Sequence, residues 1–135
     1  MENTTLAGTL ALVHPEIRTD PSAMQGQVGI ITYADNRSDD VYLRFENGRE
    51  SRYASDAVLI LKNKADLLND LKNNTHIQVA DFKDLYKVGI LQDRGRPADV
   101  VQALQIAANN PNIRDNALLA VSAVIGTSQE RSVAR

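Results

Sequence analysis

The stretches GQVGIITY at residues 26–33 and DVYLRFENG at residues 40–48 decide the fold of the first half of this 135-residue chain. The first is rich in β-branched side chains, which favour strands. The second alternates apolar and polar residues, the period of a half-buried strand. Asn47-Gly48 at its end predicts a type I′ hairpin into a partner strand at residues 49–53.

Two further apolar runs flank these strands, at residues 9–13 and 58–61. Together the runs predict five short strands separated by turn residues. We expect a meander that closes into a small β-barrel, because closure removes exposed strand edges.

The same residues resemble the small Src-homology-3-like barrels, most closely the mind-bomb type and next the KOW type of ribosomal and transcription proteins. The shared features are a Gly-x-Val-Gly opening at residues 26–29, an aromatic followed by Glu-Asn-Gly at residues 45–48, and the later Tyr53. Phe45 stands where these barrels usually have Trp. The resemblance implies a module that binds a peptide or protein without catalysis.

The second half carries helix signals. Asn63, Asp81 and Asn110 are suited to N-caps and Pro97 to a first helical position, which predicts four helices. For the second of them, helical spacing places four apolar residues on one face. They are Phe82, Leu85, Tyr86 and Ile90.

The last predicted helix starts after Asn110 and ends near Gly126, and its segment at residues 117–125 is apolar almost all round. A surface helix is apolar on one side only. We therefore expect this helix to be deeply buried or to form a homodimer contact.

These patterns predict an α+β fold: a five-stranded small β-barrel (Src-homology-3-like) at residues 1–62, a four-helix unit at residues 63–126 and a flexible tail at residues 127–135. Up to Leu61 the chain has five arginines against nine acids (−4), and the remainder, from Lys62 on, has ten basic against eight acidic residues (+2). Neither part has a basic block, which disfavours nonspecific nucleic-acid binding and a polybasic membrane contact.

Few residues suggest chemistry. The chain has no cysteine, which excludes disulfides, thiol catalysis and cysteine-based zinc sites. Its two histidines, His14 and His76, lie in different halves, and a small hydrolase or metal-assisted site using both is one hypothesis. Arg94 and Arg96 around a glycine form a weak candidate anion or phosphate site. The expectation is no metal, no cofactor and no enzymatic activity.

The best candidate surface lies on the predicted barrel. If Val41 points inward, Tyr42 and Arg44 point outward, next to Tyr33 of the adjacent strand and to Arg52 or Tyr53 of the hairpin partner, of which we select Arg52. Tyrosine and arginine are the side chains that anchor interfaces. We expect these residues to bind a protein or peptide partner.

The sequence therefore predicts a non-enzymatic interaction or adaptor module. The alternative is a nucleic-acid-associated protein with a KOW-like barrel, in which Lys83, Lys87, Arg94 and Arg96 contact phosphates. A cytoplasmic location is expected, because no apolar run is long enough to span a bilayer and the first residues lack the features of a secretory signal.

Overall fold

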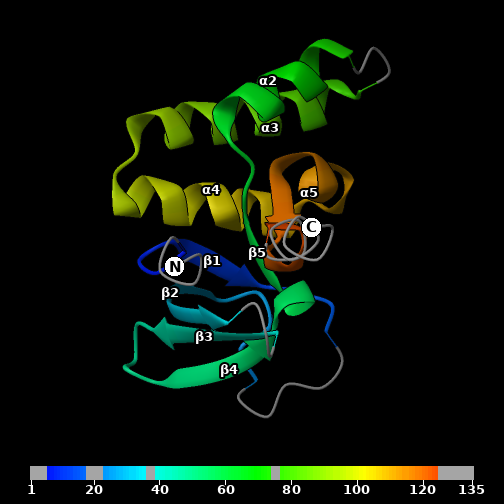
Figure 1. Ribbon diagram of the computed structural model, residues 1–135. Helices are drawn as coiled ribbons and strands as arrows, with labels where there is room; N and C mark the ends of the chain where they lie inside the picture. The colour runs from blue at the N-terminus through cyan, green and yellow to red at the C-terminus, as the bar shows by residue number, and fades with distance from the viewer. Residues whose placement is uncertain (1–5, 18–22, 36–38, 74–76, 125–135) are drawn as a thin grey trace. The chain divides into compact units, whose positions relative to one another are not determined.

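Strands come first and helices second in the computed structural model, which describes residues 6–17, 23–35, 39–73 and 77–124 (Figure 1). The strands are β1 (Leu10–Val13), β2 (Val28–Asp35), β3 (Asp40–Phe45), β4 (Glu50–Ala54), β5 (Val58–Leu61) and β6 (Leu118–Ala120). The helices are η1 (Ser55–Ala57, a 3-10 turn), α2 (Lys64–Asn73), α3 (Val79–Arg94), α4 (Pro97–Asn109) and α5 (Pro111–Ala117). The predicted α+β class is confirmed.

The six strands form one open antiparallel sheet in the order β4-β3-β2-β1-β5-β6. The predicted closed barrel is therefore wrong. Closure would require β4 to pair with β5, whereas β4 stays at one end of the strand order and β6 is added beyond β5. Closure depends on strand tilt and stagger around the whole sheet, and neither is encoded in the alternation of single strands.

The hairpin between β3 and β4 is confirmed, but its turn type is not the predicted one. The Phe45 amide donates to the Arg49 carbonyl over 2.8 Å, which closes a three-residue loop. Gly48 has a φ of 86°, and among the described non-glycine residues only Ala23 and Asp39 have a positive φ. A type I′ turn needs positive φ at both central residues, so Asn47 rules it out. Asn47 instead accepts a hydrogen bond from the Arg49 amide through its side chain.

The chain divides into two compact units, the described residues of Met1–Ile60 with Ala120–Arg135, and Leu61–Leu119. In the first unit, Phe45 packs edge-on against Tyr53 with 6.4 Å between ring centroids. Gly29 pairs with Phe45 across β2 and β3. A Cβ atom at Gly29 would lie 3.0 Å from the Arg44 carbonyl oxygen and 3.1 Å from the Phe45 ring. Glycine thus lets the ring cover the strand.

In the second unit α3 buries Leu85, Val88 and Leu91, and α4 buries Ala103 and Leu104. Helical spacing placed Phe82, Leu85, Tyr86 and Ile90 on one face of α3, and as a buried face that prediction is wrong for three of the four residues. Only Leu85 is buried, and the others are exposed. Leu85, Val88 and Leu91 also lie on one face of the helix by helical spacing, and this is the face that packs into the core of the unit. The helix begins two residues before the expected cap and ends at Gly95, which adopts a left-handed conformation (φ 73°).

The last predicted helix is also partly wrong. Asn110 caps α5, with its side-chain oxygen accepting from the Asn112 amide over 3.0 Å, but α5 ends at Ala117. The chain then becomes extended in β6, and the Lys62 amide donates to the Ala117 carbonyl over 2.9 Å. Ala117, Leu118 and Val121 are buried within one chain. The apolar run therefore changes from helix to strand at Leu118 and returns to helix at residues 121–124. Self-association through it stays a prediction.

Asn110 has a second role, which gives a stability prediction. Its side-chain nitrogen donates to Asp81 over 3.0 Å and to Asp84 over 2.8 Å, so it links the start of α5 to α3. Asn110→Ala removes the cap and leaves two carboxylates without this donor. We expect a loss of about 1–3 kcal/mol in the free energy of unfolding, measured in urea.

Asn110→Asp separates the two roles, because it keeps the cap acceptor but places a third carboxylate beside Asp81 and Asp84. We expect it to be at least as destabilising as alanine at neutral pH. Wild-type stability of Asn110→Asp would show that the contacts with α3 contribute nothing.

Candidate functional site

The four residues predicted for partner binding, Tyr33, Tyr42, Arg44 and Arg52, lie on one face of β2, β3 and β4. Tyr42 is the register partner of both Tyr33 on β2 and Arg52 on β4, so these three form a row across the strands. Arg44 lies in the next row, between Ile30 and Glu50. Directly opposed side chains in such rows are neighbours. We call these four residues the tyrosine–arginine face.

A bulge in β2 puts Tyr33 on this face. The register shifts between Ile31 and Tyr33, so that Thr32 is the extra residue opposite β3. In an uninterrupted strand, residues two apart share a face, and Tyr33 would then follow the buried Ile31 inward. The bulge reverses this, and Tyr33 is 44% exposed. The Thr32 hydroxyl donates to the Glu50 carboxylate, which ties the bulge to β4.

The two tyrosines form the centre of the face. Their ring centroids are 5.9 Å apart and the ring planes are inclined by 54°. The separation lies in the usual range for interacting aromatic pairs, and the tilt lies between the stacked and the edge-to-face arrangement. Tyr42 is half-buried, whereas Arg44 and Arg52 are exposed. The face therefore consists of a packed aromatic pair with exposed guanidinium groups next to it, Arg52 in the same row and Arg44 in the next.

The charges on this face are only loosely paired. The Nε atom of Arg52 lies 3.9 Å from the Asp40 carboxylate, and 64% of the Arg52 side chain is exposed. An exposed pair at this distance contributes little to stability. The Arg52 guanidinium can therefore turn to a ligand at little cost.

Arg94 and Arg96, the predicted anion site, flank the left-handed Gly95 between α3 and α4. The Arg96 Nε atom donates to the Asp99 carboxylate over 3.1 Å. Asp99 is buried in the first turn of α4. Because Asp99 already neutralises Arg96, the pair offers an anion less positive charge than two arginines suggest.

The two histidines give no metal centre that can be described. The Nδ1 atom of His14 accepts a hydrogen bond from the Glu16 amide over 3.1 Å, in the turn after β1. His76 lies outside the described residues. Within residues 6–17, 23–35, 39–73 and 77–124, no three His, Asp or Glu side chains are grouped closely enough to hold a metal ion.

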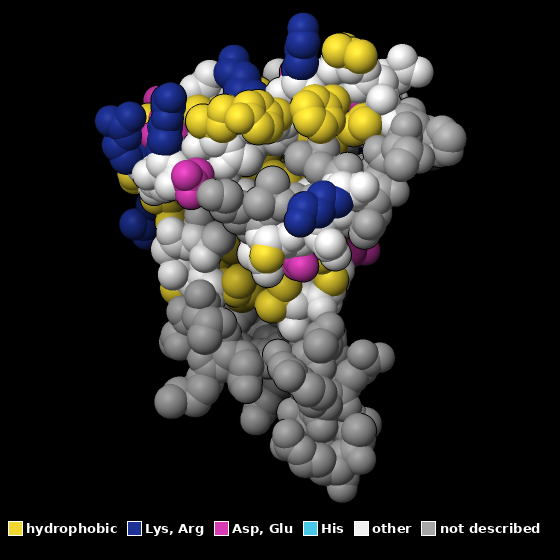
Figure 2. Space-filling view, turned by 90° about the horizontal axis from the view of Figure 1, so that it is seen from above, with side chains coloured by type: hydrophobic (Ala, Val, Ile, Leu, Met, Phe, Trp, Pro, Cys, Tyr) yellow, Lys and Arg dark blue, Asp and Glu magenta, His cyan; other side chains and the backbone are white. Residues whose placement is uncertain are grey.

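Sequence reasoning missed a second exposed surface, along α3. Val79, Phe82, Tyr86 and Ile90 are all exposed. Figure 2 shows hydrophobic side chains in a row on this side, with Lys and Arg side chains along one border. The signal was present in the sequence, since these residues lie opposite Leu85, Val88 and Leu91 on a helical projection.

The fold and the tyrosine–arginine face define the class of this molecule: an α+β chain with a sheet that presents aromatic and basic side chains on one face. Among the described residues no helix is both long and apolar enough to cross a membrane. Comparison with protein-family models, with curated proteins and with solved structures finds no match to this chain.

Proposed function

We propose that this protein is a non-enzymatic interaction module that binds a protein or peptide through the tyrosine–arginine face. The observation that carries the proposal is the cross-strand row of Tyr33, Tyr42 and Arg52. Three adjacent strands supply one side chain each, so the row is held by backbone hydrogen bonds. A rigid contact surface loses little conformational entropy on binding.

The residue types support recognition of a protein chain. Tyrosine and arginine are over-represented among residues whose truncation weakens interfaces most. Tyrosine rings bury apolar area while the hydroxyl can still form hydrogen bonds, and guanidinium groups can bind carboxylates or backbone carbonyls. Ile30, also exposed, adds an apolar neighbour beside Arg44.

The position of β4 favours an extended peptide as the ligand. β4 is the terminal strand of the sheet order, and it carries Arg52 and Glu50. A terminal strand can pair with an added peptide strand through main-chain hydrogen bonds, while side chains on the face give specificity. The resemblance to small Src-homology-3-like modules of the mind-bomb and KOW types is part of this proposal, as is the absence of catalysis.

Selection from a random peptide library tests the proposal, with the Tyr42→Ala/Arg44→Ala variant as the comparison. We expect selected peptides to bind the wild-type chain and to lose about tenfold or more in affinity for the double variant, because two anchors are removed together. Phe82→Ser is the matched control, since Phe82 is also an exposed aromatic but lies on α3 in the other unit. It should keep wild-type affinity.

Equal binding by the double variant and the wild type would exclude this face. The competing nucleic-acid function gives a different result in the same assay. It predicts binding to a mixture of nucleic acids with an affinity that falls steeply as salt is raised. That behaviour without peptide binding would replace the proposal.

A further inference from the structure

The exposed residues of α3 form a second surface, independent of the proposed function. We call Val79, Phe82, Tyr86 and Ile90 the α3 stripe. Their exposed fractions run from 40% to 71%, unusual for four large apolar residues on one helix. At 100° per residue they fall within an arc of about 80°, and they extend over about 16 Å of helix. The opposite side of α3 is the buried one, with Leu85, Val88 and Leu91.

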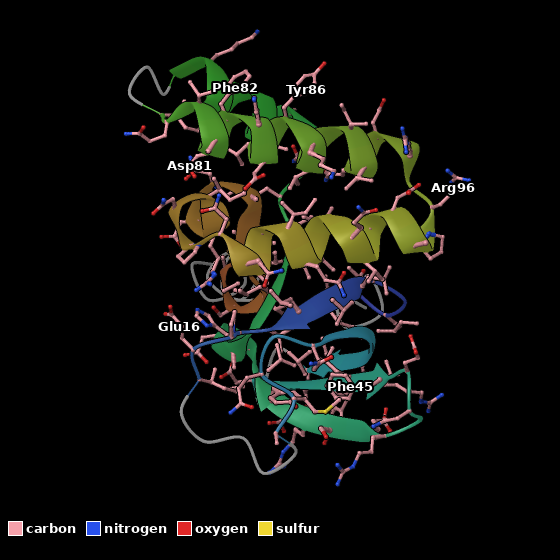
Figure 3. The ribbon with its side chains drawn as sticks, turned by 180° about the vertical axis from the view of Figure 1, so that it is seen from behind. Glu16, Phe45, Asp81, Phe82, Tyr86 and Arg96 are labelled. Atoms are coloured by element: carbon pink, nitrogen blue, oxygen red, sulfur yellow. The ribbon has the colours of Figure 1, made fainter. Side chains whose placement is uncertain are left out.

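Two aromatic rings form the centre of the α3 stripe. The rings of Phe82 and Tyr86 are parallel to within 7°, with centroids 6.3 Å apart. Figure 3 shows both side chains projecting from α3 on the side away from α4, while Asp81 lies on the side of α5. Apolar side chains spaced in this way match the contact line of a second helix, which reads positions i, i+3 or i+4, and i+7.

The α3 stripe is bordered by α2 on one side and by basic residues on the other, and this difference indicates which kind of partner can bind there. On one side α2 packs close by, since a Cβ atom at Gly89 would lie 3.6 Å from the Leu67 side chain. On the other side the helical projection places Lys83, Lys87 and Arg94 in a row, all exposed. Asp81 and Asp84 lie outside this row, on the opposite side of the helix, where both accept hydrogen bonds from Asn110.

The basic residues beside the α3 stripe favour some binding partners over others. A second copy docked antiparallel on the same stripe would bring two rows of Lys and Arg side by side, which is unfavourable. An acidic helix instead places its carboxylates opposite Lys83, Lys87 and Arg94 while its apolar side covers Phe82 and Tyr86.

We propose that the α3 stripe is the docking site for an acidic amphipathic helix of a partner protein. Such a helix carries apolar side chains at helical spacing and Asp or Glu along one border. The aromatic pair supplies the apolar contact, and the basic border sets the orientation and the preference for acidic partners. This surface is distinct from the tyrosine–arginine face, so the two proposals stand or fall separately.

The test uses two fluorescein-labelled peptides of about 16 residues, long enough to form a helix. One carries leucines at helical spacing bordered by glutamates, and the other has lysine in place of each glutamate. Fluorescence anisotropy with the full chain should show binding of the glutamate peptide at least about tenfold tighter than of the lysine peptide. Phe82→Ser/Tyr86→Ser should reduce binding of the glutamate peptide by about tenfold or more.

Charge reversal is the sharper variant. Lys83→Glu/Lys87→Glu should lose preference for the glutamate peptide and gain affinity for the lysine peptide, which a misfolded variant would not do. Arg49→Ala is the matched control, because Arg49 is an exposed arginine in the loop between β3 and β4 and belongs to neither surface, and it should bind as the wild type does. Unchanged circular dichroism and unfolding midpoints confirm that the variants fold.

Three results would overturn the proposal. The first is equal binding of both peptides, or binding of neither. The second is binding of the chain to phosphatidylglycerol vesicles that is lost in Phe82→Ser/Tyr86→Ser, which would make the stripe a membrane contact. The third is a dimer, seen by light scattering, that the same double variant dissociates.

Discussion

Replacing Phe45 with alanine is expected to lower the free energy of unfolding by about 3–5 kcal/mol. Phe45 is only 4% exposed, contacts Tyr53 edge-on and covers the strand at Gly29. Truncation removes a buried aromatic ring from this part of the sheet and leaves a cavity beside Gly29, which has no side chain to fill it. Urea unfolding followed by circular dichroism measures the change. A domain with a total stability of about 5–15 kcal/mol could unfold in large part.

Arg44→Ala is the control, since Arg44 adjoins Phe45 on β3 but points to the exposed face. It should change stability by no more than about 0.5 kcal/mol. A loss below about 1 kcal/mol for Phe45→Ala would contradict the packing described here. It would mean that the contacts with Tyr53 and Gly29 are not maintained in solution.

β3 shows how far the sequence alone can go. The alternation of Val41, Leu43 and Phe45 correctly predicts which side of the strand is buried, because strand side chains point to opposite faces in strict turn. The same rule places Tyr42 and Arg44 outward. It cannot decide whether the sheet closes, since closure depends on how β4 and β5, which would pair in the predicted barrel, are placed relative to each other.

The site was accessible to sequence reasoning only in part. Tyr42 and Arg44 follow from the alternation of β3, but Arg52 does not follow from the predicted turn. A two-residue loop at Asn47-Gly48 would pair Tyr42 with Tyr53, whereas the observed three-residue loop pairs Tyr42 with Arg52. Tyr33 reaches the same face through the bulge at Thr32, and bulges have no reliable sequence signal. The expectation for Tyr33 agrees with the structure, but strict alternation from Ile31 would have given the opposite result.

The helices show a different limit. The run after Ala117 is apolar at nearly every position, so it fits a helix or a strand equally well by periodicity. The structure switches from α5 to β6 at Leu118, where the chain joins the sheet. Such a switch is determined by long-range pairing, and no local pattern specifies it.

The second large effect concerns α3, where two apolar sets compete for burial. Leu85→Ala is expected to lower the free energy of unfolding by about 2–5 kcal/mol, because Leu85 is 1% exposed within the second unit. Helical spacing favours Phe82, Tyr86 and Ile90 as strongly as it favours Leu85, Val88 and Leu91. Thermal or urea unfolding of the full chain therefore shows directly which side of α3 forms the core.

Phe82→Ala provides the comparison on the same helix, since it removes a larger side chain from an exposed position. We expect a loss below about 1 kcal/mol, because much of the ring is already in contact with water and its truncation leaves no closed cavity. If Phe82→Ala were instead the more damaging substitution, α3 would be turned the other way in solution. The α3 stripe would then be core, and no partner helix could dock on it. A large effect for Leu85 with a small one for Phe82 leaves four apolar residues in water without a role in stability, which is the condition that a docking surface requires.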